Sequence, residues 1–323
     1  MKLEEYETLE DKKEKFEMIS GSARIHYEID IFFSWLDEWY DLNHTDTNKP
    51  VYAFRGHPEA KYRLHNSAQR HFYGKGIYQL DKTVYEGNDN NEKLNFFIKW
   101  SVKVMDEGLK WQGSLVPKIL NQQKIDYKDP FLPICSYLRH YGVATPVLDF
   151  SLNPFVALYF AIEEANHAPS NIEIENYISL YVVDIEYSNQ CADQFQTTEF
   201  YRTYLSLTKC FNPFYVFTGS NSNIYTNLNI INQEGCLIGN ILLNDSLEAA
   251  YEEFGQEYLS GFQSKKIIQC FNIHKGLIPF IRQKLKEKGI TKEFIYPDPY
   301  LIKEVVDKAT IESVKINLNY RDS

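Results

Sequence analysis

The sequence predicts an α+β fold in which a mixed, mainly antiparallel central sheet is flanked by helices. The order of the elements predicts this class, and composition and length indicate a folded chain of one or two domains. Helical and strand-like segments follow one another irregularly along the 323 residues, without the regular strand–helix–strand alternation of a doubly wound sheet. The hydrophobic fraction of 44% and the charged fraction of 24% are typical of a folded chain. The length is sufficient for one large domain or two.

The first elements are a charged segment, a helix and a strand. Residues 1–20 carry many Lys and Glu side chains and few apolar ones, which predicts a charged tail or a solvated helix. Apolar residues recur at three- and four-residue steps over 25–39, which predicts an amphipathic helix. The β-prone segment 51–55 predicts a strand that ends at Gly56.

A loop and two helices are expected in the next part of the chain. The polar residues at 85–92 predict the loop, and the pattern over 97–109 predicts a helix. A second helix is expected over 134–141, where Gly142 stands at a position that often ends helices.

The most legible element is the helix at 154–165. A short strand at 147–150 precedes it, Asn153 is a good N-cap, and Pro154 stands at the first helical position, where a missing N–H has no cost. The helix has almost no polar residue before Glu163, which indicates that it is buried. The remaining elements are strands at 178–185, 214–217, 236–243 and 267–273, and helices at 247–258 and 279–289.

Charge and targeting signals exclude several classes of protein. A net charge of −10 argues against general nucleic-acid binding, because phosphate backbones attract basic surfaces. No apolar run approaches the length of a membrane-spanning helix, and the charged N-terminus is unlike a secretory signal. The five cysteines are widely spaced without a C-x-x-C pair, which favours free thiols. We therefore expect a cytoplasmic protein with no membrane partner.

Standard catalytic and metal-binding motifs are missing from the sequence. It contains no G-x-G-x-x-G, G-x-x-x-x-G-K-[ST], H-E-x-x-H or G-x-S-x-G. His57, His65 and His71 are the closest histidine cluster, but their spacing fits neither a helical metal pair nor a zinc finger. We expect no metal centre.

The arginines are the most informative charged residues. The chain has only eight, and Arg55, Arg63, Arg70 and Arg139 fall in the two segments that look most constrained. Arginine offers a planar fork that bonds carboxylates and phosphates in a bidentate manner. Arg55 at a strand end has the chemistry to hold an anionic ligand. The alternative is a buried structural pair, for example Arg55 with Asp149, and the sequence supports both readings about equally.

Four blocks resemble the FRG domain family, which is named after a tripeptide present here as Phe54-Arg55-Gly56. The blocks are VYAFRGH at 51–57, YLRHYGVATPVLDFSLNPFVALYFA at 137–161, NQEGCL at 232–237, and 277–297 with its KGITKEFIYP. They occur in the family's order. The departures are Arg139 for Gln, Ala144 for Pro, Phe150-Ser151 for Trp-Thr, and Glu234 for a second Gln. The resemblance implies that residues 21–323 form a single FRG-type α+β domain with helical insertions.

A second resemblance is to the arginine-serine-glutamate class of ADP-ribosyltransferases. That class has an aromatic-Arg pair on its first strand, a Ser/Thr-ended strand leading into a helix, and a later strand with Gln/Glu-x-Glu. The matching positions here are Arg55, Ser151 and Gln233. The resemblance implies an ADP-ribosyltransferase-like core with NAD as its cofactor. It implies that Arg55 grips the phosphates, Ser151 braces the site and Gln233 positions a ribose.

Further cofactor contacts are expected around these positions. The resemblance adds an aromatic that stacks on nicotinamide. The residues expected to contact the cofactor are Gly56, Phe150, Asn153, Tyr159 and His140, with Tyr52 as an alternative aromatic wall and Tyr141 beside His140. The free N–H groups at the start of the helix at 154 suit a phosphate. The simpler reading is that Asn153 only caps this helix.

The catalytic carboxylate is the weakest part of the resemblance. Position 235 is Gly where the pattern has the catalytic Glu, and Glu234 is one residue away, a shift that turns a strand side chain to the opposite face. Three alternatives follow: Glu234 reaches the site through a bulge, another carboxylate such as Asp149 serves, or the protein binds a nucleotide without turning it over.

Two hypotheses about function result. In the first, a cleft binds NAD or a related small nucleotide, for ADP-ribosyl transfer to a protein target or for NAD cleavage by a toxin or defence effector. In the second, the protein is a non-catalytic binding or scaffold module in which Arg55, Asp149 and Gln233 form a buried polar network that satisfies itself. A cleft lined by Arg55, Ser151 and Gln233 favours the first.

Overall fold

The structure is a computed structural model. It describes residues 3–15, 25–45, 49–81, 84, 86–87, 89–111, 131–140, 142–198, 213–218, 228–258 and 267–297.

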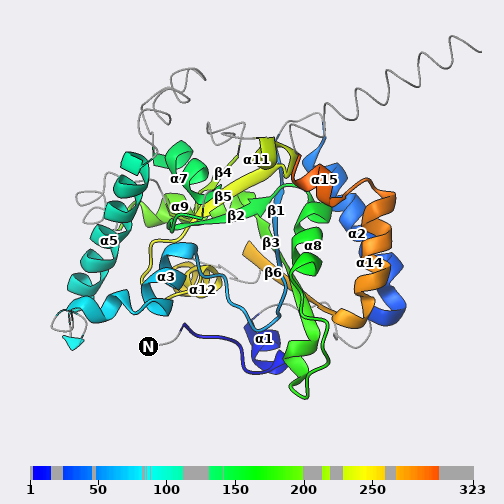
Figure 1. Ribbon diagram of the computed structural model, residues 1–323, viewed down its shortest axis with the longest axis horizontal. Coiled ribbons are helices and arrows are strands. Elements are labelled where there is room, and N and C mark those ends of the chain that lie inside the picture. The colour runs from blue at the N-terminus through cyan, green and yellow to red at the C-terminus, as the bar shows by residue number, and fades with distance from the viewer. Residues whose placement is uncertain are drawn as a thin grey trace, which may run out of the picture.

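A six-stranded antiparallel sheet forms the centre of the protein (Figure 1). The strands are β1 (Tyr52–His57), β2 (Val147–Ser151), β3 (Tyr177–Asp184), β4 (Val216–Phe217), β5 (Gly235–Gly239) and β6 (Ile268–His274). Their order is β4-β5-β2-β1-β3-β6, and every described pair is antiparallel. The predicted α+β class is confirmed.

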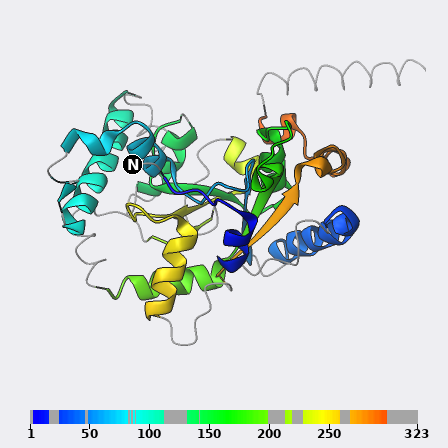
Figure 2. The ribbon, with the colours of Figure 1, turned by 90° about the horizontal axis from the view of Figure 1, so that it is seen from below.

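Helices cover both faces of the sheet (Figure 2). One apolar core lies between the sheet and α2 (Ile25–Asn43), α8 (Pro154–Glu163) and α14 (Ile278–Glu287). The other face packs against α3 (Ser67–Gly74), α5 (Asn90–Trp111), α7 (Phe131–His140), α9 (Ile185–Phe195) and α12 (Leu247–Tyr258). The shorter helices are α1 (Leu9–Lys15), η1 (Ile77–Asp81), η2 (Glu173–Asn176), α11 (Leu228–Asn232), η3 (Lys275–Leu277) and α15 (Lys292–Ile295). In the described part of the chain, no helix combines the length and the apolar character needed to cross a membrane.

The predicted elements occur with shifted ends. The loop expected at 85–92 is wrong in its last part, because α5 already begins at Asn90. The strand expected at 236–243 ends at Gly239, because the next residue, Asn240, lies opposite Pro146: Asn240 N–H donates to the Pro146 carbonyl at 3.0 Å, but proline has no N–H to return the bond. The start of α8 is as predicted: the Asn153 carboxamide oxygen accepts from the N–H of Phe155 at 3.0 Å.

The N-terminal segment packs into the core. Tyr6 and Leu9 are buried, and Lys12 is fully buried, so the expected solvated helix is corrected to one with a buried face. The Lys12 ammonium donates to the Ala60 carbonyl and to the Ser179 hydroxyl, both at 2.7 Å. Burial lowers the pKa of Lys12. Only a few apolar side chains anchor this segment, so its many charged residues led to the prediction of a solvated helix.

The sheet opens between its two central strands. β1 pairs with β3 along its whole length, and β2 pairs with β5 along its whole length. Between β1 and β2, however, only Phe54 and Ser151 are in register. The ends of the two strands therefore diverge from this point. Since Arg55 and Asp149 lie on the diverging ends, polar groups enter the middle of the sheet here.

Candidate functional site

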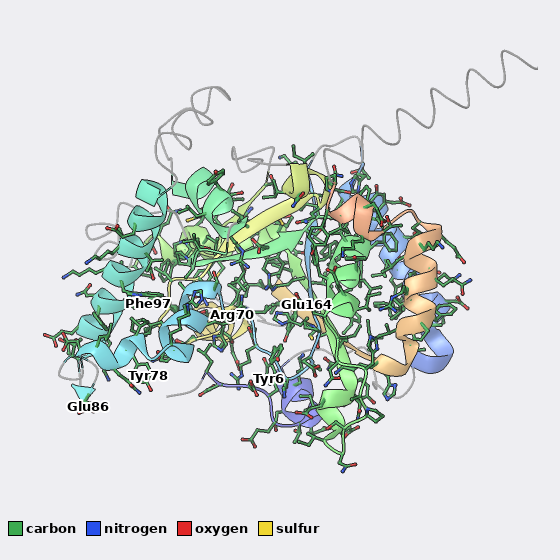
Figure 3. All side chains as sticks on the ribbon, viewed as in Figure 1. Tyr6, Arg70, Tyr78, Glu86, Phe97 and Glu164 are labelled. Atoms are coloured by element: carbon green, nitrogen blue, oxygen red, sulfur yellow. The ribbon has the colours of Figure 1, made fainter. Side chains whose placement is uncertain are left out.

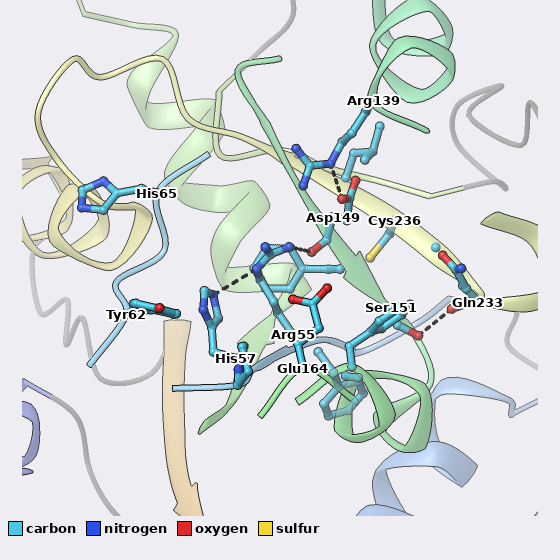
Figure 4. A pocket seen from close by; sticks show the side chains of 18 of the residues that line it. Arg55, His57, Tyr62, His65, Arg139, Asp149, Ser151, Glu164, Gln233 and Cys236 are labelled. Atoms are coloured by element: carbon cyan, nitrogen blue, oxygen red, sulfur yellow. Dashed lines mark hydrogen bonds and ion pairs between the residues drawn. The ribbon is translucent and has the colours of Figure 1, made fainter. Parts of the chain in front are cut away.

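A cavity of about 760 Å³ occupies this opening, within the size range of small-molecule sites (Figure 4). Its walls come from the diverging ends of β1 and β2, from α8, from α11 and β5, from residues 3–5, and from the loop between β1 and α3. These segments are far apart in the sequence. The fold is therefore what assembles this site.

Five of the predicted site residues line the cavity together: Arg55, Gly56, Phe150, Ser151 and Gln233. The cleft that distinguishes the two functional hypotheses is thus present. Other predicted residues are not among its lining: Asn153, Glu234, Tyr159 and Tyr52. The side chain of His140 and all of Tyr141 lie outside the described residues.

Arg55 crosses the opening and bonds the opposite strand. One of its terminal nitrogens donates to the Asp149 carbonyl oxygen, and its Nε donates to Nε2 of His57 at 3.2 Å. The guanidinium carbon lies 6.0 Å from the centre of the Phe150 ring. The predicted pairing with Asp149 therefore exists, but through the backbone carbonyl and not through the carboxylate.

All four arginines singled out in the sequence line the cavity. Arg139 Nε contacts the Asp149 carboxylate, and the same guanidinium donates to the Val147 carbonyl at 3.1 Å. Arg70 is exposed, and its guanidinium makes no hydrogen bond to any residue that the structure describes. Half of the chain's arginines thus gather at one cavity of an acidic protein.

The positive charges of the arginines in the cavity repel one another. Burial lowers the pKa of Arg55 to about 9, with the positive charge of Arg139 as the next cause, and the guanidinium stays protonated at neutral pH. Arg70 is exposed by surface area, yet the surrounding cavity walls displace part of its hydration, and this desolvation, followed by the charge of Arg139, lowers its pKa. Asp149 and Glu164 balance part of this charge, and their attraction does not outweigh the effects that lower the two pKa values. A bound anion would relieve the repulsion, so the electrostatics favour an anionic ligand.

His57 extends the arginine cluster as a neutral group. It is buried, and its pKa lies well below the usual 6.5, first because of burial and then because of the charge of Arg55. A neutral ring lets Nε2 accept from Arg55. The sequence contained His57 inside the VYAFRGH block but gave no signal of this role.

We expect His57 to make the folding stability depend on pH. Its folded pKa lies below its unfolded value of 6.5, so the unfolded chain takes up a proton first as the pH falls. The stabilisation is complete above pH 6.5 and is lost below it, by up to about 1.4 kcal/mol per pH unit. Urea unfolding of the wild type and of His57→Gln between pH 7.5 and 5 checks this. The wild type should lose more stability than the variant, and parallel profiles would contradict the assignment.

Ser151 and Asn153 have bonds that fix the strand–helix junction. The Ser151 hydroxyl is buried, lies 2.6 Å from the Gln233 carbonyl oxygen and accepts from Asn153 N–H at 2.9 Å. The Asn153 carboxamide caps α8 and donates to the Glu234 carboxylate at 2.8 Å. Ser151 therefore braces the cavity wall, and Asn153 follows the simpler reading as a helix cap.

Glu234 points away from the cavity. It lies in the turn before β5 with φ of 46°, and its carboxylate bonds His44 Nε2 at 2.7 Å as well as Asn153. A Glu at position 235 would also meet an obstacle, because a Cβ there would lie 2.4 Å from Cγ1 of Ile230. The described geometry thus offers no carboxylate at the position that the ADP-ribosyltransferase pattern uses.

Other residues complete the cavity lining without having been predicted. Phe160 and Tyr296 add aromatic rings, and Glu164 adds a carboxylate at the end of α8. Figure 4 shows the Glu164 carboxylate pointing into the cavity, and Figure 3 shows it between α8 and Arg70 of α3. Its charge raises the pKa of Arg70 against the effect of burial. Glu164 follows an almost entirely apolar helix, and this change from apolar to acidic was a signal that could have marked it as a candidate site residue.

Thiol and metal chemistry have no support among the described residues. No group of three or more His, Cys, Asp or Glu side chains there is arranged to hold a metal ion. The four described cysteines, Cys135, Cys191, Cys236 and Cys270, are free and buried, and Cys210 lies outside the described part. Burial raises the pKa of Cys236, which lines the cavity, so its thiol is a poor nucleophile.

The fold and the cavity define an α+β protein whose antiparallel sheet opens around an arginine-lined site. The sequence model of the FRG domain family matches residues 50–170. An FRG domain is therefore present in this chain, and the resemblance of the first two blocks is confirmed. The blocks at 232–237 and 277–297 lie outside that match. Searches of curated proteins and of solved structures each found no significant match.

Proposed function

We propose that the cavity binds NAD or a closely related anionic nucleotide. The observation that carries the proposal is the convergence of Arg55, Ser151 and Gln233 on one ligand-sized cavity whose arginines repel each other without an anion. The diphosphate would lie against Arg55, Arg70 and Arg139. Gln233 would bond a ribose hydroxyl, since its Nε2 donates to the Ile295 carbonyl at 3.2 Å and so holds the amide in place.

Cleavage of the nicotinamide–ribose bond is a further step of the same proposal. The C1′–N bond would break with its electron pair passing to the pyridinium nitrogen, and water would then attack C1′ and lose a proton. A carboxylate favours such a cation-like transition state. Glu164 lines the cavity and its carboxylate makes no hydrogen bond to described residues, so it is the candidate base. Transfer to a protein target, or a toxin or defence role, requires that this cleavage takes place.

The scaffold alternative has one observation in its favour. Two of the three guanidinium nitrogens of Arg55 bond Asp149 and His57 within the protein, as they would in a structural polar network. A scaffold would fold normally and bind no nucleotide.

We expect NAD to raise the melting temperature of the wild type. At a concentration a hundred times the Kd, a ligand stabilises the folded state by about 2.7 kcal/mol, which corresponds to a few degrees for a chain of this size. Gln233→Ala should lose most of the shift. Glu234→Gln is the matched control from the next position and should keep it, because Glu234 points away from the cavity.

Nicotinamide release, measured on the same samples, separates binding from turnover. A melting shift with release supports an enzyme, and a shift without release supports a nucleotide-binding module. Absence of a shift in the wild type would favour the scaffold alternative. Equal losses in Gln233→Ala and Glu234→Gln would mean that NAD binds elsewhere.

A further inference from the structure

The loop at 58–66, between β1 and α3, is held by buried charged groups. The Lys12 ammonium donates to the Ala60 carbonyl at 2.7 Å, and the Glu248 carboxylate accepts from Leu64 N–H at 3.1 Å. Lys12 is fully buried and Glu248 is 4% exposed. Burying a charge is unfavourable unless it is fully bonded. Two buried charges that bond this backbone therefore give the loop one fixed shape.

This loop presents three side chains to one end of the cavity, Tyr62, Arg63 and His65. Tyr62 is 38% exposed, so one side of this aromatic residue is accessible to a ligand. His65 is 4% exposed, and no side chain bonds either of its ring nitrogens; its polar contact in the protein alone is with the backbone of Glu4. The buried Nε of Arg63 is unpaired. Buried polar atoms are nearly always paired, so the weakly satisfied nitrogens of Arg63 and His65, two residues apart, require an explanation.

The outer wall at this end consists of residues 3–5. Glu4 lies 3.2 Å from a terminal nitrogen of Arg63, yet the Glu4 side chain is 76% exposed. Exposed ion pairs of this kind contribute little to stability. A ligand can therefore displace Glu4 and reach the groups behind it.

We propose that Tyr62, Arg63 and His65 form the subsite for the adenine of the dinucleotide. The inference rests on the function proposed above and adds the orientation of the ligand. The Tyr62 ring would stack on the base, as exposed aromatics do in single-strand nucleic-acid sites. His65 and Arg63 Nε would bond the edge of adenine, where ring-nitrogen acceptors flank the amino donor.

The chemistry of His65 distinguishes a base from a second phosphate. Burial lowers the pKa of His65, so the ring is neutral at pH 7 and offers one donor and one acceptor. A phosphate at this pH needs donors only, whereas a purine edge needs both. The other parts of the dinucleotide would then lie further along the cavity, with the diphosphate at Arg55 and Arg70 and the nicotinamide ribose towards Gln233.

The test compares NAD with nicotinamide mononucleotide, the half of NAD that lacks adenosine. Calorimetric titration should give Tyr62→Ala and His65→Leu a roughly tenfold weaker Kd for NAD. The Kd for the mononucleotide should stay within about twofold. Tyr187→Ala is the matched control, because Tyr187 is a 39% exposed tyrosine that does not line the cavity. It should change neither Kd.

Stability provides a second readout. Because His65 bonds no side chain and its polar contact is with the exposed Glu4 segment, His65→Leu should lower the melting temperature only slightly. A structural histidine would lower it without changing the ratio of the two Kd values. If His65→Leu fails to fold, Tyr62→Ala decides alone.

Two outcomes would overturn the subsite. One is an unchanged Kd for NAD in both variants, and the other is an equal weakening for both ligands. A wild type that binds NAD no more tightly than the mononucleotide would refute the subsite and leave the proposed function standing. A wild type that binds neither ligand would refute the proposed function itself, and the subsite with it.

Discussion

Replacing Gly56 by alanine should destabilise the protein by about 3 kcal/mol or more, the upper part of the range for overpacking. A Cβ at this position would lie 2.0 Å from the Ala157 carbonyl oxygen and 2.7 Å from the Ala161 backbone nitrogen. These are backbone atoms of α8 and cannot rotate away. The helix would have to leave the sheet, and it forms one wall of the cavity. Urea unfolding monitored by circular dichroism measures the loss.

Gly74→Ala is the matched control for this change. Gly74 is the last residue of α3, and a Cβ there would meet no atom within 4 Å. Alanine is also a better helix former than glycine, so this variant should be as stable as the wild type or slightly more stable. If both variants unfold at the same urea concentration, the close approach of β1 and α8 is not what requires glycine at position 56.

The role of Gly56 therefore differs from the one predicted. From the sequence we predicted that Gly56 contacts the cofactor, because it adjoins Arg55. The structure shows that it lines the cavity and also allows α8 to contact the strand directly. The contact joins residues about 100 positions apart, so no local pattern could have indicated it. The family resemblance singled out Gly56, but it did not indicate that the close approach of α8 is what requires a glycine there.

The fold was largely predictable because its signals are local. The cap at Asn153, the proline at 154 and the apolar run after them mark α8 without reference to the rest of the chain. The N-terminal segment was not predictable in the same way. A lysine normally marks a solvated face, and only the Ala60 carbonyl and the Ser179 hydroxyl, distant in sequence, make the buried position of Lys12 tolerable.

The site was predictable in its arginines and not in its carboxylates. Arg55 and Arg139 were singled out because arginine is rare in this chain and both lie in the segments that look most constrained. Both line the cavity. Glu234 was expected one residue from the catalytic position, but a positive φ in the turn before β5 directs its side chain to His44. Turn geometry decides which way this side chain points, and a motif carries no information about it. The loop with Tyr62 and His65 was missed because its polar residues resemble any surface loop.

Loss of the Arg55 charge should have the largest effect on ligand binding. Charge-assisted bonds to phosphate are about twice as strong as neutral ones, so Arg55→Met should weaken the Kd for NAD about a hundredfold. Methionine keeps much of the side-chain length and removes only the guanidinium. The variant loses the bonds to Asp149 and His57 but also the repulsion from Arg139, so its stability should fall by no more than about 1–2 kcal/mol.

Two further variants separate charge from geometry. Arg55→Lys keeps the charge and loses the planar fork, so its affinity for NAD should lie between those of the wild type and Arg55→Met. Arg282→Met removes an exposed arginine of α14 that does not line the cavity. It changes the net charge by the same amount and should leave the affinity unchanged, apart from a small effect that salt removes.

The central claim is that the opening between β1 and β2 is an anion-binding nucleotide site organised by Arg55. Calorimetric titration of the wild type and of Arg55→Met with NAD at low salt tests it most directly. We predict saturable binding of one NAD per chain in the wild type and a roughly hundredfold weaker Kd in the variant, with both proteins folded. No binding heat in the wild type, or the same Kd in both proteins, would contradict the claim.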